Sequence, residues 1–384
     1  MIDLNHKFPI GIQTFEKLRE GGYLYVDKTA LLWKIASTST PYILSRPRRF
    51  GKSLLLSTFE AYFKGKKELF GGLAIEKLET EWKEYPVLHL DLNAEKYDSL
   101  QALHAILSSQ LTQWELKYGH GVDEETLSQR FIGVIRRASE LTGRGVVMLI
   151  DEYDKPLLQA LNNGELLDEY CNTLKAFYGV LKSTDRYLRF VFLTGVTKFA
   201  QDSVFSDLNQ LNDISLDFAY STICGITREE LITTFISELR QLSKKNGMSQ
   251  EKVMETISRK YGGYHFHHRG EEIFNPFSLF ISFDKLEFGN YWFQMDEPSF
   301  LFLFDFLRKS GYTPHTLFNG MELAASSFIE YRIKNKNLIA LIYQSGYLTI
   351  KGYNKEFQLY RLEVPNEEVK FCILNNIISI KKRI

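Results

Sequence analysis

The sequence lacks the features that mark several specialised classes of protein. Its three cysteines, Cys171, Cys224 and Cys372, lie far apart and show neither zinc-site spacing nor a disulfide framework. No run of about 18 apolar residues is present, so no membrane span is expected. The N-terminal stretch is partly charged and has no long apolar core, so no secretory signal is expected. We therefore expect a cytoplasmic protein with reduced thiols.

The chain also lacks an excess of charge of either sign. Lysine and arginine together number 47, as do aspartate and glutamate, so the formal net charge is zero. This balance provides no overall attraction to nucleic acid, although it is compatible with a local basic face. Hydrophobic residues make up 44% of the 384 residues, which is sufficient for two or three domains with ordinary cores.

Strand-like and helix-like segments alternate through the first 225 residues. The clearest strand is Val146 to Ile150, five consecutive apolar residues, a pattern typical of a parallel strand that is buried on both faces. Strands are expected at 42–44, 87–92, 146–150 and 188–194, and helices at 53–63, 100–118, 124–141 and 166–182. The alternation predicts an α/β domain over 1–225, a P-loop NTPase-type parallel sheet with helices on both faces.

The pattern changes after Ile226. Thr227 and Glu230 form a capping box that predicts a helix continuing to Lys244. Further elements are expected as helices at 249–261, 298–310 and 323–334, and as a hairpin of strands 346–353 and 356–362. We therefore expect a helical lid over 226–297 and a helical, winged-helix-like C-terminal region over 298–384.

The segment from Ser45 to Ser53, SRPRRFGKS, carries the strongest functional signal. It is similar to the phosphate-binding pattern G-x-x-x-x-G-K-[ST], with Arg46 in place of the first glycine. In that pattern Lys52 would reach the outer phosphates, and the hydroxyl of Ser53 would hold Mg²⁺. The expected strand–loop–helix order would direct a helix N-terminus toward the phosphates.

The arginines of this loop leave two interpretations open. They contact phosphate, or they form a solvated basic loop paired with nearby carboxylates. Arginine at position 46 disfavours the left-handed backbone conformation that glycine adopts easily, and the adjacent proline stiffens the chain. We therefore expect a backbone path that differs from that of the standard loop. The nucleotide is expected to contact Arg46, Pro47, Arg48, Arg49, Phe50, Gly51, Lys52, Ser53 and Leu54.

Two further motifs follow expected strands. Asp151 and Glu152 come directly after the buried run, where an aspartate can hold Mg²⁺ and a glutamate can polarise an attacking water. A helix cap is the structural alternative for this pair. Thr194 and Lys198 follow the next strand and would sense the γ-phosphate. Because ligands of such sheets bind outside the carboxyl ends of the strands, these motifs are expected to meet at one site.

These motifs resemble the predicted AAA-ATPase-like proteins of bacteria, a P-loop family often fused to a PD-(D/E)XK nuclease-like domain. The resemblance rests on these segments, in chain order: 8–11, 25–29, 46–53, 150–154, 193–198, 261–264, 274–278, 290–293 and 364–369. It implies ATP and Mg²⁺ as cofactors and an arginine-rich loop as the usual form of the motif. No N/T-K-x-D motif for reading guanine is present, which also favours adenine.

The chain departs from the family at its C-terminal end. In the family, the segment matching Val364 to Val369 usually leads into the nuclease-like domain, whereas this sequence stops at Ile384. We therefore expect no nuclease activity, and truncation of a longer protein is one expectation.

Three functional hypotheses follow. The first is an ATP-binding, Mg²⁺-dependent, ATP-hydrolysing protein that couples nucleotide state to movement of a domain or partner. The second is a nucleotide-binding switch without turnover, and the third is a nucleic-acid-associated defence or mobile-element protein. A protein or nucleic-acid partner and an oligomer stay open, whereas no membrane partner is expected. The histidines at 265, 267 and 268 have no second ligand cluster, so a structural role is expected.

Overall fold

The computed structural model describes residues 6–93, 96–199, 204, 205, 208, 210–292, 314–331 and 338–381. Its centre is a five-stranded sheet in the order β2-β3-β4-β1-β5, and every neighbouring pair is parallel. The strands are β1 (Tyr42–Ser45), β2 (Val87–Asp91), β3 (Val146–Asp151), β4 (Leu188–Gly195) and β5 (Asn212–Asp213).

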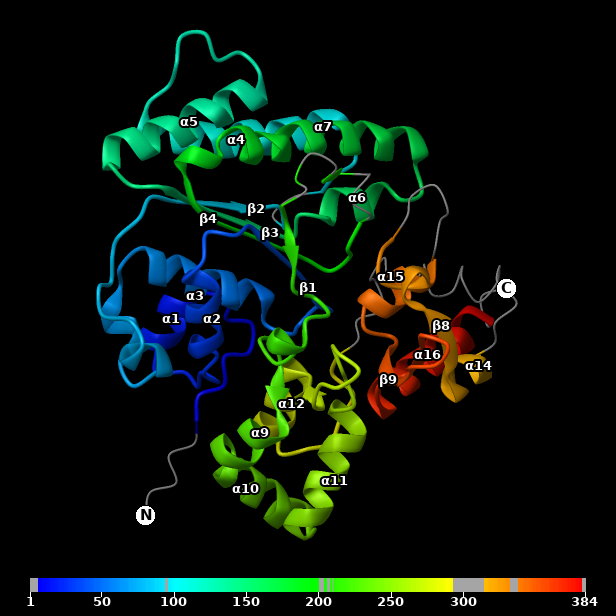
Figure 1. Cartoon of the computed structure of the whole chain (residues 1–384). Helices are drawn as coiled ribbons and strands as arrows, with labels where there is room; N and C mark the ends of the chain where they lie inside the picture. Colours follow the sequence, from blue (N-terminus) through cyan, green and yellow to red (C-terminus); the bar gives the residue numbers. More distant parts are fainter. Residues whose placement is uncertain are drawn as a thin grey trace.

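Helices cover both faces of this sheet (Figure 1). Along β3, Met148 and Ile150 pack in one apolar cluster, and Val147 and Leu149 pack in another, as the alternation of a strand requires. The first cluster includes helices α4 (Leu100–Tyr118), α5 (Leu127–Thr142), α6 (Lys155–Ala160) and α7 (Gly164–Ser183). The second includes α2 (Thr29–Ala36) and α3 (Lys52–Phe63), beside α1 (Phe15–Glu20). The α/β class and the parallel sheet with helices on both faces are confirmed.

The helical region that follows the sheet consists of residues 226–292. A short antiparallel pair, β6 (Ile226–Thr227) and β7 (Ile273–Phe274), joins its ends. Its helices are α9 (Arg228–Thr234), α10 (Ile236–Asn246), α11 (Gln250–Tyr261) and α12 (Pro276–Lys285).

The capping box of this helical region is present, but the single helix predicted through Lys244 is wrong. The Thr227 hydroxyl accepts from Glu230 N–H, and the Glu230 carboxylate accepts from Thr227 N–H. The helix then ends at Phe235, whose ring is fully buried and stacks on Phe283 at 5.2 Å. The break allows this ring to enter the core, and the preceding pair of threonines are weak helix formers.

The C-terminal region, residues 314–381, contains an antiparallel sheet in the order β8-β10-β9. Its elements are α14 (Pro314–Asn319), β8 (Met321–Ala324), α15 (Leu338–Gln344), β9 (Thr349–Asn354), β10 (Leu359–Glu363) and α16 (Glu367–Lys381). The predicted hairpin is confirmed. The helix predicted over 323–334 is wrong, because Met321 to Ala324 pair with β10, and a 3₁₀ turn follows over Ala325–Ser327. The helix predicted at 298–310 lies outside the described residues.

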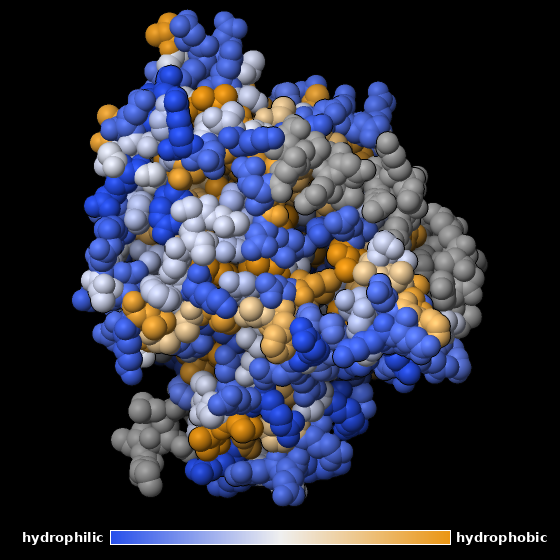
Figure 2. All heavy atoms as spheres, in the orientation of Figure 1, coloured by the Kyte–Doolittle hydropathy of each residue, from blue (hydrophilic) through white to orange (hydrophobic). Residues whose placement is uncertain are grey.

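Short 3₁₀ turns complete the described elements, at Lys67–Phe70, Ala74–Lys77, Asp185–Tyr187 and Phe218–Tyr220. Across the described chain, the helices are too short or too polar to cross a bilayer. Figure 2 shows that the viewed face is mostly hydrophilic, with apolar side chains exposed in small separate groups.

Candidate nucleotide-binding site

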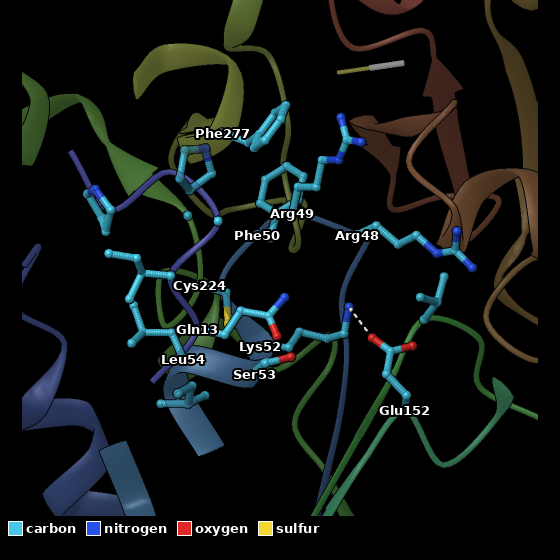
Figure 3. A pocket seen from close by; sticks show the side chains of 18 of the residues that line it. Gln13, Arg48, Arg49, Phe50, Lys52, Ser53, Leu54, Glu152, Cys224 and Phe277 are labelled. Carbon is cyan, nitrogen blue, oxygen red and sulfur yellow. Dashed lines mark ion pairs between the residues drawn. The ribbon is translucent and has the colours of Figure 1, made fainter. Parts of the chain in front are cut away.

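A cavity of about 620 Å³ lies where the strands of the parallel sheet end. Its wall includes residues that follow β1, β2, β3 and β4, among them Arg48, Asn93, Glu152 and Val196. The rest of the wall comes from segments 9–13, 24–28, 223–226 and 276–280 and from α15 and the residue that follows it. The loop at 48–55 runs along this cavity (Figure 3), so the cavity lies at the site that the sequence predicted.

In the loop from Arg46 to Gly51, the residues with a left-handed backbone lie in the second half of the loop. Arg49 has a φ of +68° and Gly51 has a φ of +94°. Gly51 precedes the first residue of α3, where a left-handed backbone favours glycine. The loop thus turns into the helix without a glycine at position 46. The first turn of α3 lies at the cavity, where its unpaired N–H groups can meet an anion.

Lys52 lies inside the cavity and is 4% exposed. Its Nζ donates to the carbonyl oxygens of Arg46 at 3.1 Å and Pro47 at 3.4 Å. The same Nζ lies 3.6 Å from Oε1 of Glu152 (Figure 3). Ser53 follows Lys52 in the cavity wall. The structure therefore brings the loop lysine, the adjacent hydroxyl and the predicted glutamate together.

Asp151 and Thr194 form a buried pair beside these residues. Thr194 Oγ1 donates to Asp151 Oδ1 at 2.6 Å, and Glu152 N–H donates to the same oxygen at 2.9 Å. Thr194 is fully buried and lies outside the cavity wall, so its side chain orients Asp151. Glu152 has a φ of +51°, which is uncommon for a residue with a side chain. Glu152 also lines the cavity.

Asp154 supports the same edge of the sheet from beneath. Its carboxylate is fully buried and accepts from Val196 N–H at 3.1 Å and Thr197 N–H at 2.6 Å. Burial, and then the charge of Glu152, raises the pKa of Asp154 to about 7. Asp154 therefore fixes the backbone that follows β4, on which Val196 reaches the cavity.

The two long side chains predicted to reach phosphate from Arg46 and Lys198 are directed elsewhere. The Arg46 guanidinium points away from the cavity: it donates to Ser215 O at 2.7 Å and Tyr220 O at 3.2 Å and lies 4.1 Å from the centre of the Phe266 ring. Arg46 is 1% exposed. A long side chain at the usual glycine position therefore fits by entering the core behind the loop, where carbonyl groups satisfy its donors.

Lys198 is also directed elsewhere. Its Nζ lies 2.7 Å from Asp213 and 3.0 Å from Glu330, which joins the edge of the parallel sheet to the C-terminal region. Although burial works against the charged form, these two carboxylates raise the pKa of Lys198. Two close carboxylates stabilise the ammonium more than a distant phosphate could, so the predicted γ-phosphate sensor acts as a structural link.

The other loop residues are placed in different ways. Arg48, Arg49, Phe50 and Leu54 line the cavity, and the buried Phe50 ring also packs edge-on against the rings of Tyr264 and Phe266. Pro47, which was predicted to contact the nucleotide, lies outside the cavity wall and contributes its carbonyl to Lys52. Arg49 donates to the carbonyls of Tyr291 and Trp292 and stacks over Phe277 at 4.2 Å (Figure 3). Each loop side chain thus faces either the cavity or a neighbouring region of the molecule.

The cavity has two chemically distinct ends. In Figure 3, Gln13 and Leu54 lie on one side of Lys52, and Arg48 and Glu152 lie on the other. We call the second side the polar end, which comprises Arg48, Asn93, Glu152 and Lys155. The apolar end, as we call the apolar part of the wall, comprises Ile10, Ile12, Leu24, Val26, Ile226, Phe277 and Phe280. Its residues come from the N-terminal segment and the helical region, which meet where Phe8 stacks on Phe280 at 5.8 Å.

Sequence reasoning missed the apolar end, Asn93 and Lys155. The segments 8–11, 25–29 and 274–278 carry the resemblance to the family, yet none of their residues was among the predicted site residues. A signal for Lys155 was its position four residues after Asp151, on the same turn as the acidic pair.

The oxygen groups near Lys52 suit Mg²⁺. The Ser53 hydroxyl and the Glu152 carboxylate are hard oxygen donors in the cavity wall, and the Asp151 carboxylate is a third, although Asp151 is 3% exposed and lies outside the wall. Mg²⁺ in nucleotide sites takes one or two such groups together with phosphate and water. Among the described residues, a second group with metal-ligand chemistry is Glu115, His120 and Glu124, where Arg130 and Arg137 already pair with the carboxylates.

Three comparisons with known proteins bear on this site. A family model described as a predicted AAA-ATPase matches residues 9–205. An uncharacterized protein in the vnfD 5′ region of Azotobacter chroococcum mcd 1 is 38% identical over 380 residues, covering 98% of this chain and 70% of that protein. The Aeropyrum pernix ORC2 protein, solved as ADPNP–ADP complexes, aligns over 91% of this chain and 94% of its own, with a TM-score of 0.34 and 10% identity. The last similarity is too low to support an argument.

Proposed function

Because the chain belongs to the predicted AAA-ATPase family, we propose that it binds ATP with Mg²⁺ and hydrolyses it to ADP and phosphate. The observation that carries the proposal is the meeting of Lys52 and Glu152, 3.6 Å apart, within a cavity at the ends of the parallel strands. A loop cation and a carboxylate that face one another across a cavity are the groups that phosphoryl transfer to water requires.

At the polar end, Lys52 exchanges two neutral carbonyl partners for the anionic phosphates. The N–H groups at the start of α3 donate to the same phosphates. Ser53 and Asp151 would hold Mg²⁺, which would neutralise charge on the phosphate oxygens, and Thr194 orients the Asp151 carboxylate by its 2.6 Å hydrogen bond. Release of Lys52 to the phosphates frees Glu152 to orient the attacking water.

At the apolar end, the walls fit an uncharged aromatic base. Apolar side chains from the N-terminal segment face Phe277 and Phe280 of α12, and the backbone around Gly11 supplies polar groups beside them. Adenine presents two flat apolar faces and a hydrogen-bonding edge, and such walls bind it by burial and stacking. The preference for ATP over GTP is part of the proposal.

Nucleotide state is coupled in this proposal to the C-terminal region. Arg49 holds the carbonyls of Tyr291 and Trp292, while the N–H groups of the same two residues donate to the buried carboxylate of Glu368 in α16. Glu368 also accepts from Ser278 Oγ at 2.8 Å. A movement of the loop on binding phosphate would therefore be transmitted to α12 and α16 through the backbone groups of Tyr291 and Trp292.

A second contact supports the same coupling. Gly346 lies so close to the loop that a Cβ built there would be 2.9 Å from Cβ of Pro47, and its φ is +88°. Leu341 and Ser345, just before it, line the cavity itself. The C-terminal region thus touches both the loop and the space that the nucleotide would fill.

The test is the Glu152→Gln substitution, which preserves shape and removes the base. Binding of Mg·ATP is measured by calorimetry, and turnover is measured by phosphate release. The expected result is turnover at least about 100-fold lower with ATP affinity changed by less than about threefold, since the group acts on water rather than on ATP. Equal turnover in both proteins would overturn the catalytic assignment. A wild-type protein that binds ATP without turnover would instead favour the non-hydrolysing switch.

A further inference from the structure

Lys155 is a cation at the polar end that neither the loop motif nor the acidic motif includes. It is the first residue of α6 and lines the cavity together with Asn93, Glu152 and Arg48. Its Nζ donates to both oxygens of Asn93, the backbone carbonyl and Oδ1, the latter at 2.7 Å. Asn93 in turn is held by its N–H, which donates to Asp91 Oδ1 at 2.8 Å at the end of β2. The ammonium is therefore fixed in place by neutral oxygens.

The charge of Lys155 lacks a close counterion. Within the described chain, no carboxylate lies within ion-pair distance of its Nζ, in contrast to Lys28, Lys52 and Lys198. Burial, offset in part by the more distant Glu152 and reinforced by Arg48, lowers the pKa of Lys155. A cation that is partly desolvated, near a second cation and held only by carbonyl-type oxygens gains strongly from an incoming anion.

The position of Lys155 in the cavity determines which part of the nucleotide it can contact. The loop lysine reaches the β- and γ-phosphates, and the base occupies the apolar end on the far side of Lys52. In Figure 3, Arg48 and Glu152 lie beyond Lys52 as seen from Gln13 and Leu54, and Lys155 lines the same cavity. A nucleotide whose base occupies the apolar end would therefore direct its last phosphate toward these groups. ADP, which lacks that phosphate, would leave Lys155 on Asn93.

We propose that Lys155 binds the terminal phosphate and so enables the site to distinguish a nucleoside triphosphate from a diphosphate. The inference rests on the proposed function and adds to it the residue that reads the γ-phosphate, a task for which Lys198 is misplaced. Asn93 is a positioning residue that keeps the ammonium at the cavity until the phosphate arrives. Binding then exchanges two hydrogen bonds from the ammonium to uncharged oxygens for a contact between the ammonium and an anionic phosphate.

A purely structural Lys155 would behave differently. Its bonds to Asn93 join α6 to the segment after β2, so their loss alone would lower the melting temperature and weaken both nucleotides to the same extent. A residue that reads the γ-phosphate changes the ratio of ATP affinity to ADP affinity. That ratio is therefore the decisive quantity, because effects common to both nucleotides cancel in it.

The experiment measures the dissociation constants of ATP and ADP, each with Mg²⁺, by calorimetry on the full chain. Lys155→Ala is compared with wild type, with Lys155→Arg, and with Lys182→Ala, which removes an exposed lysine at the end of α7. For Lys155→Ala we expect ATP affinity about tenfold lower and ADP affinity within about twofold of wild type. Lys155→Arg is expected to retain most of the ATP preference, and Lys182→Ala all of it.

An unchanged ATP/ADP ratio in Lys155→Ala would overturn the inference, whether both affinities fall together or neither falls. That outcome is distinct from failure of the proposed function, in which the wild-type protein itself binds neither nucleotide. Asn93→Ala provides an independent check, because it leaves the lysine in place. We expect it to lower the ATP/ADP ratio by about threefold, and an effect on melting temperature alone would assign Asn93 a structural role only.

Discussion

At its polar end the cavity is formed by residues close to the ends of strands, whereas at its apolar end it is assembled from segments far apart in the sequence. The polar end inherits its geometry from the sheet, because Arg48, Asn93 and Glu152 follow three strands of the same parallel sheet, β1, β2 and β3. The apolar end exists only where the N-terminal segment packs against α12. In the proposed function, phosphate recognition would therefore depend on a rigid scaffold, and base recognition would depend on docking of two regions.

This difference implies that the two ends can be damaged separately. Substitutions at the polar end should act according to the number of phosphates on the ligand. Substitutions at the apolar end should affect ATP, ADP and adenosine alike, because all three carry the same base.

The largest effect is expected from Lys52→Ala. Removing the ammonium eliminates charge-assisted contacts to the outer phosphates, and ATP affinity should fall by about 100-fold. Adenosine affinity should be unchanged, since adenosine has no phosphate. Calorimetric titrations with the two ligands test this pair of outcomes, and equal loss for both would mean that Lys52 supports the fold of the whole cavity.

A smaller effect is expected from Phe277→Ala at the apolar end. The change removes a half-buried ring and the surface over which Arg49 stacks, so affinities for ATP, ADP and adenosine should each fall by about fivefold. Phe218→Ala is the matched control, because Phe218 is 52% exposed and lies outside the cavity wall. A loss confined to ATP would contradict the separation of the two ends.

Glu368→Ala tests whether docking of the C-terminal region sustains the site. It leaves the N–H groups of Tyr291 and Trp292 without their buried acceptor, so the melting temperature should fall by at least about 3 °C and ATP affinity by about threefold. Glu367→Ala, one position away on α16, removes only a partly exposed ion pair with Arg259, so it should change neither quantity measurably.

Glu368→Gln adds a conservative comparison. Its amide oxygen can accept from the same two N–H groups, so most of the stability should return. Wild-type affinity in Glu368→Ala would show that the loop and the C-terminal region are not coupled.

The smallest effect is expected at Asp154 and appears as a pH dependence of stability. The folded protein retains a proton up to about pH 7 that the unfolded chain releases near its ordinary pKa of 3.8. Stability from this group therefore decreases as pH rises through that interval and is constant above it. In Asp154→Asn this contribution is absent, so the melting temperature should fall less between pH 5 and pH 7, by about 3 °C, when measured by circular dichroism without Mg²⁺. Parallel curves for the two proteins would refute the assignment.

The sequence was a good guide wherever local pattern and backbone hydrogen bonding decide the outcome. The apolar run Val146–Ile150 predicted a buried parallel strand, and the glycine and lysine at 51 and 52 predicted the turn into α3. The four residues at or near the ends of parallel strands lie together as predicted: Lys52, Asp151, Glu152 and Thr194.

It was a poor guide to the direction of long side chains. Arg46 looked like a phosphate ligand because it occupies the loop, yet carbonyls of Ser215 and Tyr220 draw it inward, and no local pattern predicts those contacts. Lys198 follows a strand as a sensor would, but Asp213 and Glu330 pair with it from other parts of the fold. Tertiary pairing likewise overrode helix propensity where Met321–Ala324 became β8.

The strand order has a consequence for how the protein is made. β1, which leads into the loop, has no neighbour close in sequence: Tyr42 pairs with Phe192 of β4 on one side and Asn212 of β5 on the other. On a ribosome that adds about 5–20 residues per second, the loop waits on the order of ten seconds for the strand that will flank it. During that interval its apolar strand is unpaired and no phosphate site exists. Nucleotide cannot assist the early steps of folding and can stabilise only a chain that has already closed its sheet.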